Sequence, residues 1–315
     1  MERIVFLDRK TCRTALRPPR FPHQWQDHDT TAPEELADRL RDATIVITNK
    51  VPLRAPQIND LRGLRLIAVA ATGVDVVDLD ASRRLGIAVC NLPRYTLNSV
   101  PEHVFMLMLA LQRNLFNYRK AVTSGLWAKS PIFSLLDYPI HDLAGSTLGI
   151  IGYGALGQEV EKRGRAFGMD ILIAERKGAS PVRSGRVPFE EVLRRSDIVT
   201  LHCPLTPDTR HLIGSHELTL MKPRALLINA ARGGLIDESA LANALQFGLL
   251  GGAAVDVLSQ EPPAADHPLP ALDLPRLIIT PHIGWASEEA VRTLAEELIS
   301  NLEAFVAGSP KNVVM

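Results

Sequence analysis

Short runs of aliphatic and β-branched residues alternate with helix-length stretches along the whole chain. In the first third, candidate strands occupy 4–7, 44–48, 66–70 and 87–90, and candidate helices occupy 33–41 and 78–85. This alternation is typical of parallel sheets that are covered by helices on both faces. It predicts an α/β fold for a chain whose 315 residues are enough for two cores.

A second series of strands begins after a longer helix. We expect this helix over 100–120, because Val104, Leu107 and Met108 stand at helical spacing. A loop at 127–143 follows it. Further strands are predicted at 147–151, 171–174, 198–201, 225–229, 252–257 and 277–279, and a last helix at 287–307. Six strands from one segment make a complete doubly wound sheet.

Charge and cysteine content exclude several classes of protein. The formal net charge is zero, so nothing favours a long-range attraction to nucleic acid or to an anionic membrane. Cys12, Cys90 and Cys203 are scattered and odd in number, which argues against a disulfide framework or a metal site. No apolar run approaches the roughly 18 residues that cross a bilayer, and the first residues lack the apolar region of a secretory signal. We therefore expect a soluble, cytoplasmic protein.

A glycine-rich turn follows the strand predicted at 147–151. It reads Gly152-Tyr153-Gly154-Ala155-Leu156-Gly157, a GxGxxG pattern at the start of a helix. The first glycine permits the tight turn, the second lets a pyrophosphate approach the backbone, and the third allows the helix to pack closely on the strand. The N-terminus of the helix attracts phosphate groups. Such turns also occur without a ligand, but this one has a second element of a dinucleotide site.

That second element is Glu175, about 18 residues after Gly157 at the end of the next predicted strand. A carboxylate at this place binds the ribose hydroxyls of a dinucleotide and repels the extra phosphate of NADP(H). Arg176 and Lys177 follow directly and could attract that phosphate, or could be a solvated loop. We predict that NADH is accepted and that NADPH is used more weakly.

Three further loops carry an arginine, an acid and a histidine. Arg232, Glu261 and His282 each follow the end of a predicted strand. In an open α/β sheet the ligand lies outside the carboxyl ends of the strands, so these loops should converge. Singly, Arg232 could cap a helix or pair with Asp237, Glu261 could be a loop acid, and His282 could be a structural histidine. Convergence beside a dinucleotide motif favours a catalytic site.

The three side chains suit reversible hydride transfer to a 2-keto acid. The arginine would bind the substrate carboxylate and keto oxygen, and the histidine would donate a proton to the developing alkoxide. Histidine changes charge near neutral pH, and a neighbouring carboxylate orients the imidazole and stabilises its charged form. Glu261 is the candidate for that carboxylate.

Several separate motifs resemble the D-isomer-specific 2-hydroxyacid dehydrogenases, and the similarity covers nearly the whole chain. They are Ala71-Thr-Gly73-Val74-Asp75, the glycine turn, Leu201-His-Cys-Pro204, Asn229-Ala-Ala-Arg232-Gly, Asp256-Val-Leu-Ser-Gln-Glu261-Pro and Pro281-His282. The resemblance implies a Rossmann cofactor domain inserted into a flavodoxin-like substrate domain, with the active site in the cleft between the two domains. We expect the substrate domain at 1–99 and 286–315, the NAD(P)-binding domain at 100–285, and a homodimer built around the inserted domain.

The same resemblance implies roles for individual residues. Arg232, Glu261 and His282 match the family's catalytic positions, and the Gly73 and Val74 amides should bind the substrate carboxylate. Asp256 should contact the nicotinamide carboxamide. The other expected cofactor contacts are Tyr153, Ala155, Leu156, Arg176, Pro204 and Ala230. No metal is expected.

Two segments, 48–50 and 173–178, are similar to the glycerate dehydrogenase and hydroxypyruvate reductase group. The expected substrate pairs are hydroxypyruvate with D-glycerate, or glyoxylate with glycolate. Phosphoglycerate, D-lactate and general glyoxylate reductases are the nearest alternatives, and a dinucleotide-sensing corepressor is an alternative from another class. A formate dehydrogenase is disfavoured, because Gln is expected there in place of Glu261. Pro101 departs from the small residues usual at this place and bears on the start of the helix.

Overall fold

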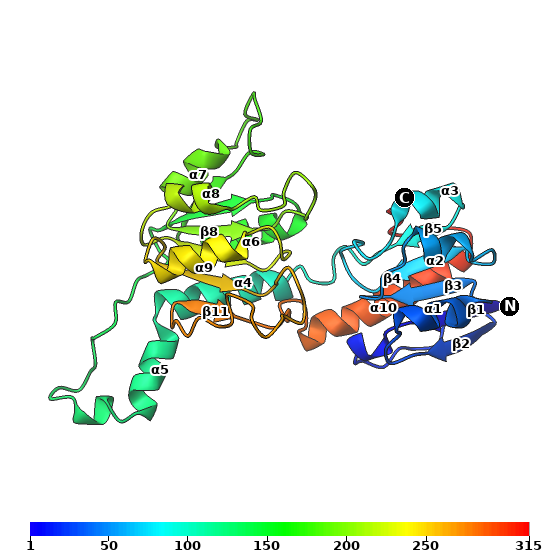
Figure 1. Cartoon of the computed structure of the whole chain (residues 1–315), viewed down its shortest axis with the longest axis horizontal. Coiled ribbons are helices and arrows are strands. Elements are labelled where there is room, and N and C mark those ends of the chain that lie inside the picture. The colour runs from blue at the N-terminus through cyan, green and yellow to red at the C-terminus, as the bar shows by residue number, and fades with distance from the viewer. Residues whose placement is uncertain (315) are drawn as a thin grey trace. The chain divides into compact units, whose positions relative to one another are not determined.

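The computed structural model describes residues 1–314, which form two compact units. Unit 1 comprises Met1–Thr96 together with the residues from Ala286 onward, and unit 2 comprises Leu97–Trp285. Unit 2 is therefore an insertion in the chain of unit 1. Each unit is a parallel sheet with helices packed on it (Figure 1), which confirms the predicted α/β class.

The sheet of unit 1 has five parallel strands in the order β2-β1-β3-β4-β5. This is the flavodoxin-like order. The strands are β1 (Glu2–Phe6), β2 (His23–Asp27), β3 (Ile45–Thr48), β4 (Leu66–Val69) and β5 (Ala88–Cys90). The helices are α1 (Leu36–Leu40), α2 (Ala55–Asn59), α3 (Leu79–Arg84) and α10 (Glu288–Val306), with short 3-10 turns at Arg9–Thr11 and Pro33–Glu35.

Alternate residues of these strands face opposite sides of the sheet. Val5, Val46 and Ile67 belong to a buried cluster with apolar residues of α1, α2 and α3. Their neighbours along the strands, such as Phe6 and Ile47, are buried as well. The last helix, α10, packs against β4. Both faces of the sheet are therefore apolar, as parallel strands covered on both sides require.

Unit 2 contains a six-stranded parallel sheet in the order β11-β10-β9-β8-β6-β7. The strands are β6 (Thr147–Ile151), β7 (Asp170–Ile173), β8 (Ile198–Leu201), β9 (Leu226–Asn229), β10 (Gly252–Val255) and β11 (Leu277–Ile279). An isolated parallel bridge joins Ala174, just after β7, to Val187. When the Val187 segment is counted as a strand beside β7, the order contains the 3-2-1-4-5-6 arrangement of dinucleotide-binding sheets, with one further strand.

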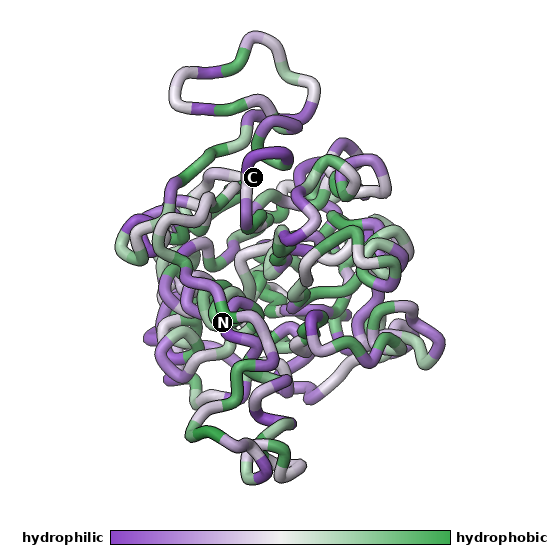
Figure 2. Tube along the Cα trace, turned by 90° about the vertical axis from the view of Figure 1, so that its left-hand side faces the viewer, coloured by the Kyte–Doolittle hydropathy of each residue, from purple (hydrophilic) through white to green (hydrophobic). Residues whose placement is uncertain are grey.

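Two layers of helices cover this sheet. The helices of unit 2 are α4 (Ser99–Gln112), α5 (Leu115–Thr123), α6 (Ala155–Ala166), α7 (Phe189–Arg195), α8 (Ser215–Leu220) and α9 (Glu238–Gln246), with a 3-10 turn at Trp127–Lys129. Leu148 and Ile150 of β6 pack with α4 and α6, whereas Ile151 packs with α7, α8 and α9. Hydrophobic and hydrophilic stretches alternate along the trace (Figure 2).

The helix expected over 100–120 is in fact two helices, α4 and α5. Asn114 lies between them with a φ of 51°, a left-handed conformation that ends α4 and that asparagine adopts more readily than most residues. The segment after α5 returns to this junction, where the side-chain amide of Asn114 donates to the Pro139 carbonyl. The arm, defined here as 115–141, extends away from the body of unit 2 (Figure 1). No helix within residues 1–314 has the length and apolar character to span a membrane.

Candidate active site

The glycine turn after β6 has the geometry of a dinucleotide cradle. Gly152 has a φ of +93°, and a Cβ on it would lie 2.4 Å from the Cys203 backbone nitrogen. A Cβ on Gly157 would lie 2.3 Å from the Gly152 carbonyl oxygen, so this glycine lets α6 pack on the turn. A Cβ on Gly154 would meet nothing within 4 Å. The approach to the N-terminus of α6 is therefore open, and the residues present fit a pyrophosphate group.

The other predicted cofactor residues surround this turn. Pro204 and Ala230 follow β8 and β9 at the same edge of the sheet. The guanidinium of Arg186 lies 4.7 Å from the centre of the Tyr153 ring. Glu175 lies just after β7, and its carboxylate accepts a hydrogen bond of 2.6 Å from Nε of Arg183. Arg183 was not among the residues that the sequence indicated.

Asp256 is a buried centre of hydrogen bonds after β10. Its side chain is 2% exposed and accepts hydrogen bonds from the Thr280 hydroxyl (2.5 Å) and from the amides of Ile283 (2.9 Å) and Gly284 (2.8 Å). Burial alone would raise the pKa of Asp256, but hydrogen bonds from His103, Thr280 and these amides lower it overall. The carboxylate is thus ionised and fixes the turn that carries His282.

His103 is a second residue that sequence reasoning missed. It belongs to α4, and its Nε2 lies 3.0 Å from the Thr280 hydroxyl and 3.3 Å from Oδ1 of Asp256. Its position among apolar residues at helical spacing gave no signal that distinguishes it from a histidine of the core. It connects α4 to the turn after β11.

His282 and Glu261 form a close pair at the ends of adjacent strands. Nδ1 of His282 lies 2.6 Å from one carboxylate oxygen of Glu261, and the other oxygen accepts a hydrogen bond from the Leu258 amide (3.0 Å). The Glu261 carboxylate therefore accepts a hydrogen bond from the Nδ1–H group of His282, which leaves Nε2 to act on a ligand. Within residues 1–314, Nε2 of His282 has no hydrogen-bond partner.

The backbone of His282 is strained. Its φ is +56°, and its amide donates to the Asp256 carbonyl (2.8 Å) while its carbonyl accepts from the Trp285 indole (3.0 Å). A non-glycine residue in this region costs on the order of 1–3 kcal/mol and persists only where the surrounding structure enforces it. Such strain is concentrated at functional sites.

Arg232 lies in the loop after β9, next to the Glu261 loop. The Asn229 side chain donates to the Arg232 carbonyl (2.9 Å) and accepts from the Ala231 amide (3.1 Å), which fixes the turn. A Cβ on Gly233 would lie 1.9 Å from the Leu258 carbonyl oxygen, so the two loops are in direct backbone contact. Because β9, β10 and β11 are neighbours in the sheet, the structure brings the Arg232, Glu261 and His282 loops to one edge.

Gly73 and Val74 lie in unit 1, in the loop after β4. The Thr72 hydroxyl donates to the Leu92 carbonyl (2.8 Å), and the Asn91 side chain donates to the Thr72 carbonyl (2.7 Å). The amides of Gly73 and Val74 donate no hydrogen bond to any residue in 1–314. Two consecutive amide donors held in this way can bind a carboxylate.

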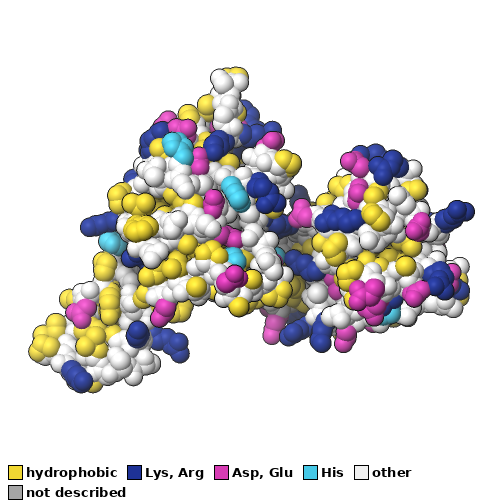
Figure 3. Space-filling view, viewed as in Figure 1, with side chains coloured by type: hydrophobic (Ala, Val, Ile, Leu, Met, Phe, Trp, Pro, Cys, Tyr) yellow, Lys and Arg dark blue, Asp and Glu magenta, His cyan; other side chains and the backbone are white. Residues whose placement is uncertain are grey.

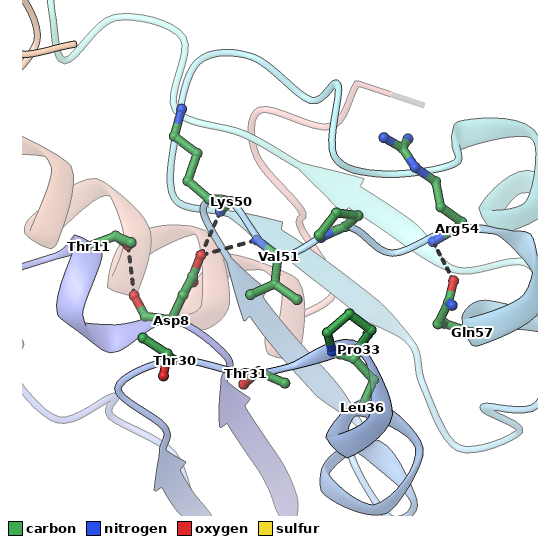
Figure 4. Close-up of a pocket in the computed structure, with 11 residues that line it drawn as sticks. Asp8, Thr11, Thr30, Thr31, Pro33, Leu36, Lys50, Val51, Arg54 and Gln57 are labelled. Atoms are coloured by element: carbon green, nitrogen blue, oxygen red, sulfur yellow. Dashed lines mark hydrogen bonds between the residues drawn. The ribbon is translucent and has the colours of Figure 1, made fainter. Parts of the chain in front are cut away.

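Asp8 fixes the neighbouring loop after β3. Its buried carboxylate accepts hydrogen bonds from the amides of Asn49 (3.0 Å), Lys50 (2.6 Å) and Val51 (3.2 Å), beside a pocket at the end of the sheet (Figure 4). Burial raises the pKa of Asp8, and these hydrogen bonds oppose the rise. The loop continues to Leu53, which pairs with Val77 after the Gly73–Val74 turn. The sequence gave no signal for this role of Asp8.

Comparison with known proteins gives the family. The NAD binding domain of D-isomer specific 2-hydroxyacid dehydrogenases matches residues 105–284. The chain is 51% identical over 314 residues to a glycerate dehydrogenase of Methylorubrum extorquens, with 99% of each chain covered. The crystal structure of the TT0316 protein of Thermus thermophilus superposes with a TM-score of 0.84 at 35% identity, over 99% of this chain and 100% of that one. An NADPH-dependent glyoxylate/hydroxypyruvate reductase of Sinorhizobium meliloti, solved with NADP and malonate, gives 0.82 at 25% identity over 99% and 96%. The chain therefore belongs to the D-isomer-specific 2-hydroxyacid dehydrogenase family of NAD(P)-dependent oxidoreductases.

Proposed function

We propose that the protein reduces hydroxypyruvate to D-glycerate, with glyoxylate as a second substrate. The observation that carries this proposal is the 2.6 Å contact between Glu261 and His282 on a strained turn, at the sheet edge that also holds Arg232. A charged donor, an acid–base group and its carboxylate are what a 2-keto acid reductase needs. The whole-length relationship to a glycerate dehydrogenase supports hydroxypyruvate in particular.

Each residue has a distinct part in the proposed reaction. NAD(P)H, when bound, would supply the hydride for the keto carbon. Nε2 of His282 donates the proton to the keto oxygen, while Glu261 orients the ring and stabilises the imidazolium. Arg232 binds the keto oxygen and the carboxylate, where negative charge develops. The Gly73 and Val74 amides would bind the substrate carboxylate, and Asp256 would contribute to holding the nicotinamide carboxamide.

A substrate panel tests the function. Initial rates of NADH and NADPH oxidation are measured with hydroxypyruvate, glyoxylate, pyruvate and 3-phosphohydroxypyruvate, and the glycerate formed is resolved by chiral chromatography. We expect the highest kcat/KM with hydroxypyruvate and only D-glycerate as product. A higher kcat/KM with pyruvate or 3-phosphohydroxypyruvate, or formation of L-glycerate, would contradict the assignment. Absence of turnover with all four would favour a non-enzymatic role, such as dinucleotide sensing.

The arm of unit 2 supports a homodimer. Its apolar side chains are exposed in the single chain, and Phe133 is 91% exposed. Figure 3 shows hydrophobic side chains gathered over the arm. The exposed apolar residues of the arm are Leu115, Phe116, Val122, Leu126, Trp127, Ile132, Phe133, Leu136 and Ile140. Large groups of exposed apolar residues mark interaction sites more often than free surface, so a second copy covering the arm belongs to the proposal. The free thiols of Cys12, Cys90 and Cys203 support a cytoplasmic location.

A further inference from the structure

Glu175, the acid expected to select NAD(H), already accepts hydrogen bonds from groups of the protein itself. Glu175 is 4% exposed, and both of its carboxylate oxygens accept hydrogen bonds from Arg183, at 2.6 Å from Nε and 2.6 Å from Nη2. The amides of Arg176 (2.7 Å) and Arg183 (3.2 Å) donate to it as well. The Arg183 guanidinium, followed by the Arg176 amide, lowers the pKa of Glu175 to about 2. The negative charge of Glu175 is therefore compensated by a two-point contact with one arginine.

The bridge between Ala174 and Val187 places Arg183 there. The Glu175 amide donates to the Val187 carbonyl (2.8 Å), and the Val187 amide donates to the Ile173 carbonyl (2.9 Å). These bonds bring the segment before Val187 alongside the end of β7. Arg183 is thus held beside Glu175 by the backbone, while 58% of its side chain stays exposed to a ligand.

The surroundings of Glu175 carry an excess of positive charge. Arg176 is exposed directly after it, and Arg186 bridges the Tyr153 ring and the Ala174 carbonyl. Lys177 is paired with Glu217 at 2.8 Å. Positive side chains therefore outnumber negative ones here: the cations are Arg176, Arg183, Arg186 and Lys177, and the carboxylates are Glu175 and Glu217. Such an arrangement attracts a phosphate dianion, whereas a bare carboxylate at this place would repel it.

We propose that Arg183 is a specificity-determining residue that opens the adenosine end of the cofactor site to NADPH. Its guanidinium neutralises Glu175 and, together with Arg176, binds the 2′-phosphate. NADH uses the same site without the phosphate contact. This inference deepens the proposed function and rests on it for the reaction, but cofactor affinity can be measured without any substrate.

Direct binding tests the proposal. Dissociation constants of NADH and NADPH are measured on the purified protein by nicotinamide fluorescence, without a keto acid. Arg183→Gln should weaken NADPH binding by about tenfold or more, equivalent to ~1.4 kcal/mol. It should leave NADH binding unchanged or tighter, because the released Glu175 carboxylate can then accept the ribose hydroxyls. Arg183→Lys keeps a charge but not the two-point contact, and should retain part of the NADPH affinity.

Two further variants sharpen the test. Glu175→Gln should tighten NADPH binding, and the double variant Glu175→Gln/Arg183→Gln should lose that gain. Arg195→Gln is the matched control, because Arg195 forms an exposed ion pair with Glu191 on α7. It should change neither dissociation constant. Thermal unfolding checks that each variant is folded.

Equal weakening of both cofactors by Arg183→Gln, or an unchanged ratio of the two dissociation constants, would overturn the proposal. If Arg183→Gln does not fold, the response of NADPH binding to Arg183→Lys and Glu175→Gln decides the question. Failure of the substrate panel would leave these binding constants intact. The two proposals can therefore fail separately.

Discussion

At the scale of single residues, the Glu261–His282 pair governs how the two directions of the reaction depend on pH. Ketone reduction requires a protonated imidazole, which the carboxylate at 2.6 Å stabilises. Glu261→Gln should move the alkaline limb of the kcat/KM profile for reduction toward acid, because the amide no longer stabilises the charged imidazole. Oxidation of D-glycerate requires the neutral imidazole, so its acidic limb should also move to lower pH.

Profiles of kcat/KM against pH for both reactions measure these shifts, with cofactor affinity determined separately. His282→Ala should nearly abolish both reactions while cofactor binding persists. If both limbs of Glu261→Gln coincide with those of the unmodified protein, Glu261 does not tune the acid–base group.

Arg232 is expected to act mainly on the transition state. Arg232→Ala removes a charge-assisted contact where the keto oxygen becomes negative, so kcat/KM should fall by about 100-fold or more. Arg232→Lys should restore activity only in part, because an ammonium lacks the planar fork. Arg194→Ala, which removes an exposed arginine of α7, is the control. Steady-state kinetics near those of the control would place Arg232 outside the reaction.

His202 should make the protein sensitive to mild acid. Burial lowers its pKa to about 4, and its Nδ1 has no hydrogen-bond partner within the described residues. In the unfolded chain the pKa is about 6.5, so the unfolded state takes up the proton first. The stability contributed by neutral His202 is present above pH ~6.5 and is lost as the pH falls toward 4. Between pH 7 and 5 this loss should be on the order of 1–2 kcal/mol.

Urea unfolding of the cofactor-free protein at these two pH values measures the loss, and His202→Gln provides the comparison. The variant should lose less stability than the unmodified protein over the same interval. Equal losses in both proteins would assign the acid sensitivity to other groups.

At the scale of elements, two glycines of the turn after β6 differ in role: replacing one should weaken cofactor binding, and replacing the other should lower the free energy of unfolding. A Cβ on Gly154 meets no atom, so Gly154→Ala should change the free energy of unfolding by less than about 1 kcal/mol. It should nevertheless weaken NADH binding by about tenfold or more, since the methyl group occupies the approach of the pyrophosphate. Gly157→Ala would place a Cβ 2.3 Å from a carbonyl oxygen and should destabilise by ~1–3 kcal/mol. Unfolding curves and NADH titrations of both variants check the contrast; similar effects of the two would refute it.

The elements that the sequence predicted are those with a strong apolar period. All six strands of unit 2 were predicted within two residues at each end, because most of their residues are apolar and are buried in a sheet covered on both faces. β2 was missed because it is a polar edge strand, His-Gln-Trp-Gln-Asp. α2 has five residues and begins with Ala-Pro, so it lacks a helical period. The break at Asn114 was missed because apolar spacing does not report a left-handed residue.

The residues of the candidate site also fall into those that the sequence could predict and those that it could not. Arg232, Glu261 and His282 could be predicted because each follows a strand end, and strand ends are visible in the sequence. Asp8 and His103 could not, because each acts through partners far along the chain: Asn49 for Asp8, and Asp256 for His103. Only the folded chain brings such pairs together.

At the scale of the whole molecule, we expect the arm to determine the state of association. Phe133→Asp and Leu136→Asp place charges on two of its exposed apolar residues. Each should convert a dimer to a monomer, as measured by light scattering of the eluted protein, because an unpaired charge in an apolar interface is costly. Phe247→Asp is the control, since Phe247 is an exposed apolar residue just after α9 and outside the arm. A monomeric unmodified protein, or a dimer that both arm variants leave intact, would reject the arm as the interface.

The insertion of unit 2 also determines the order in which the parts of the two units are synthesised. The strands of unit 1 leave the ribosome first, but α10, which packs against β4, is translated only after Trp285. Unit 2 is continuous in sequence and can complete its own sheet during that interval. At the usual rates of translation, its 189 residues take roughly 10–40 s to synthesise. For this time the sheet of unit 1 lacks its last helix, so apolar residues that are buried in the folded protein remain exposed and prone to aggregation.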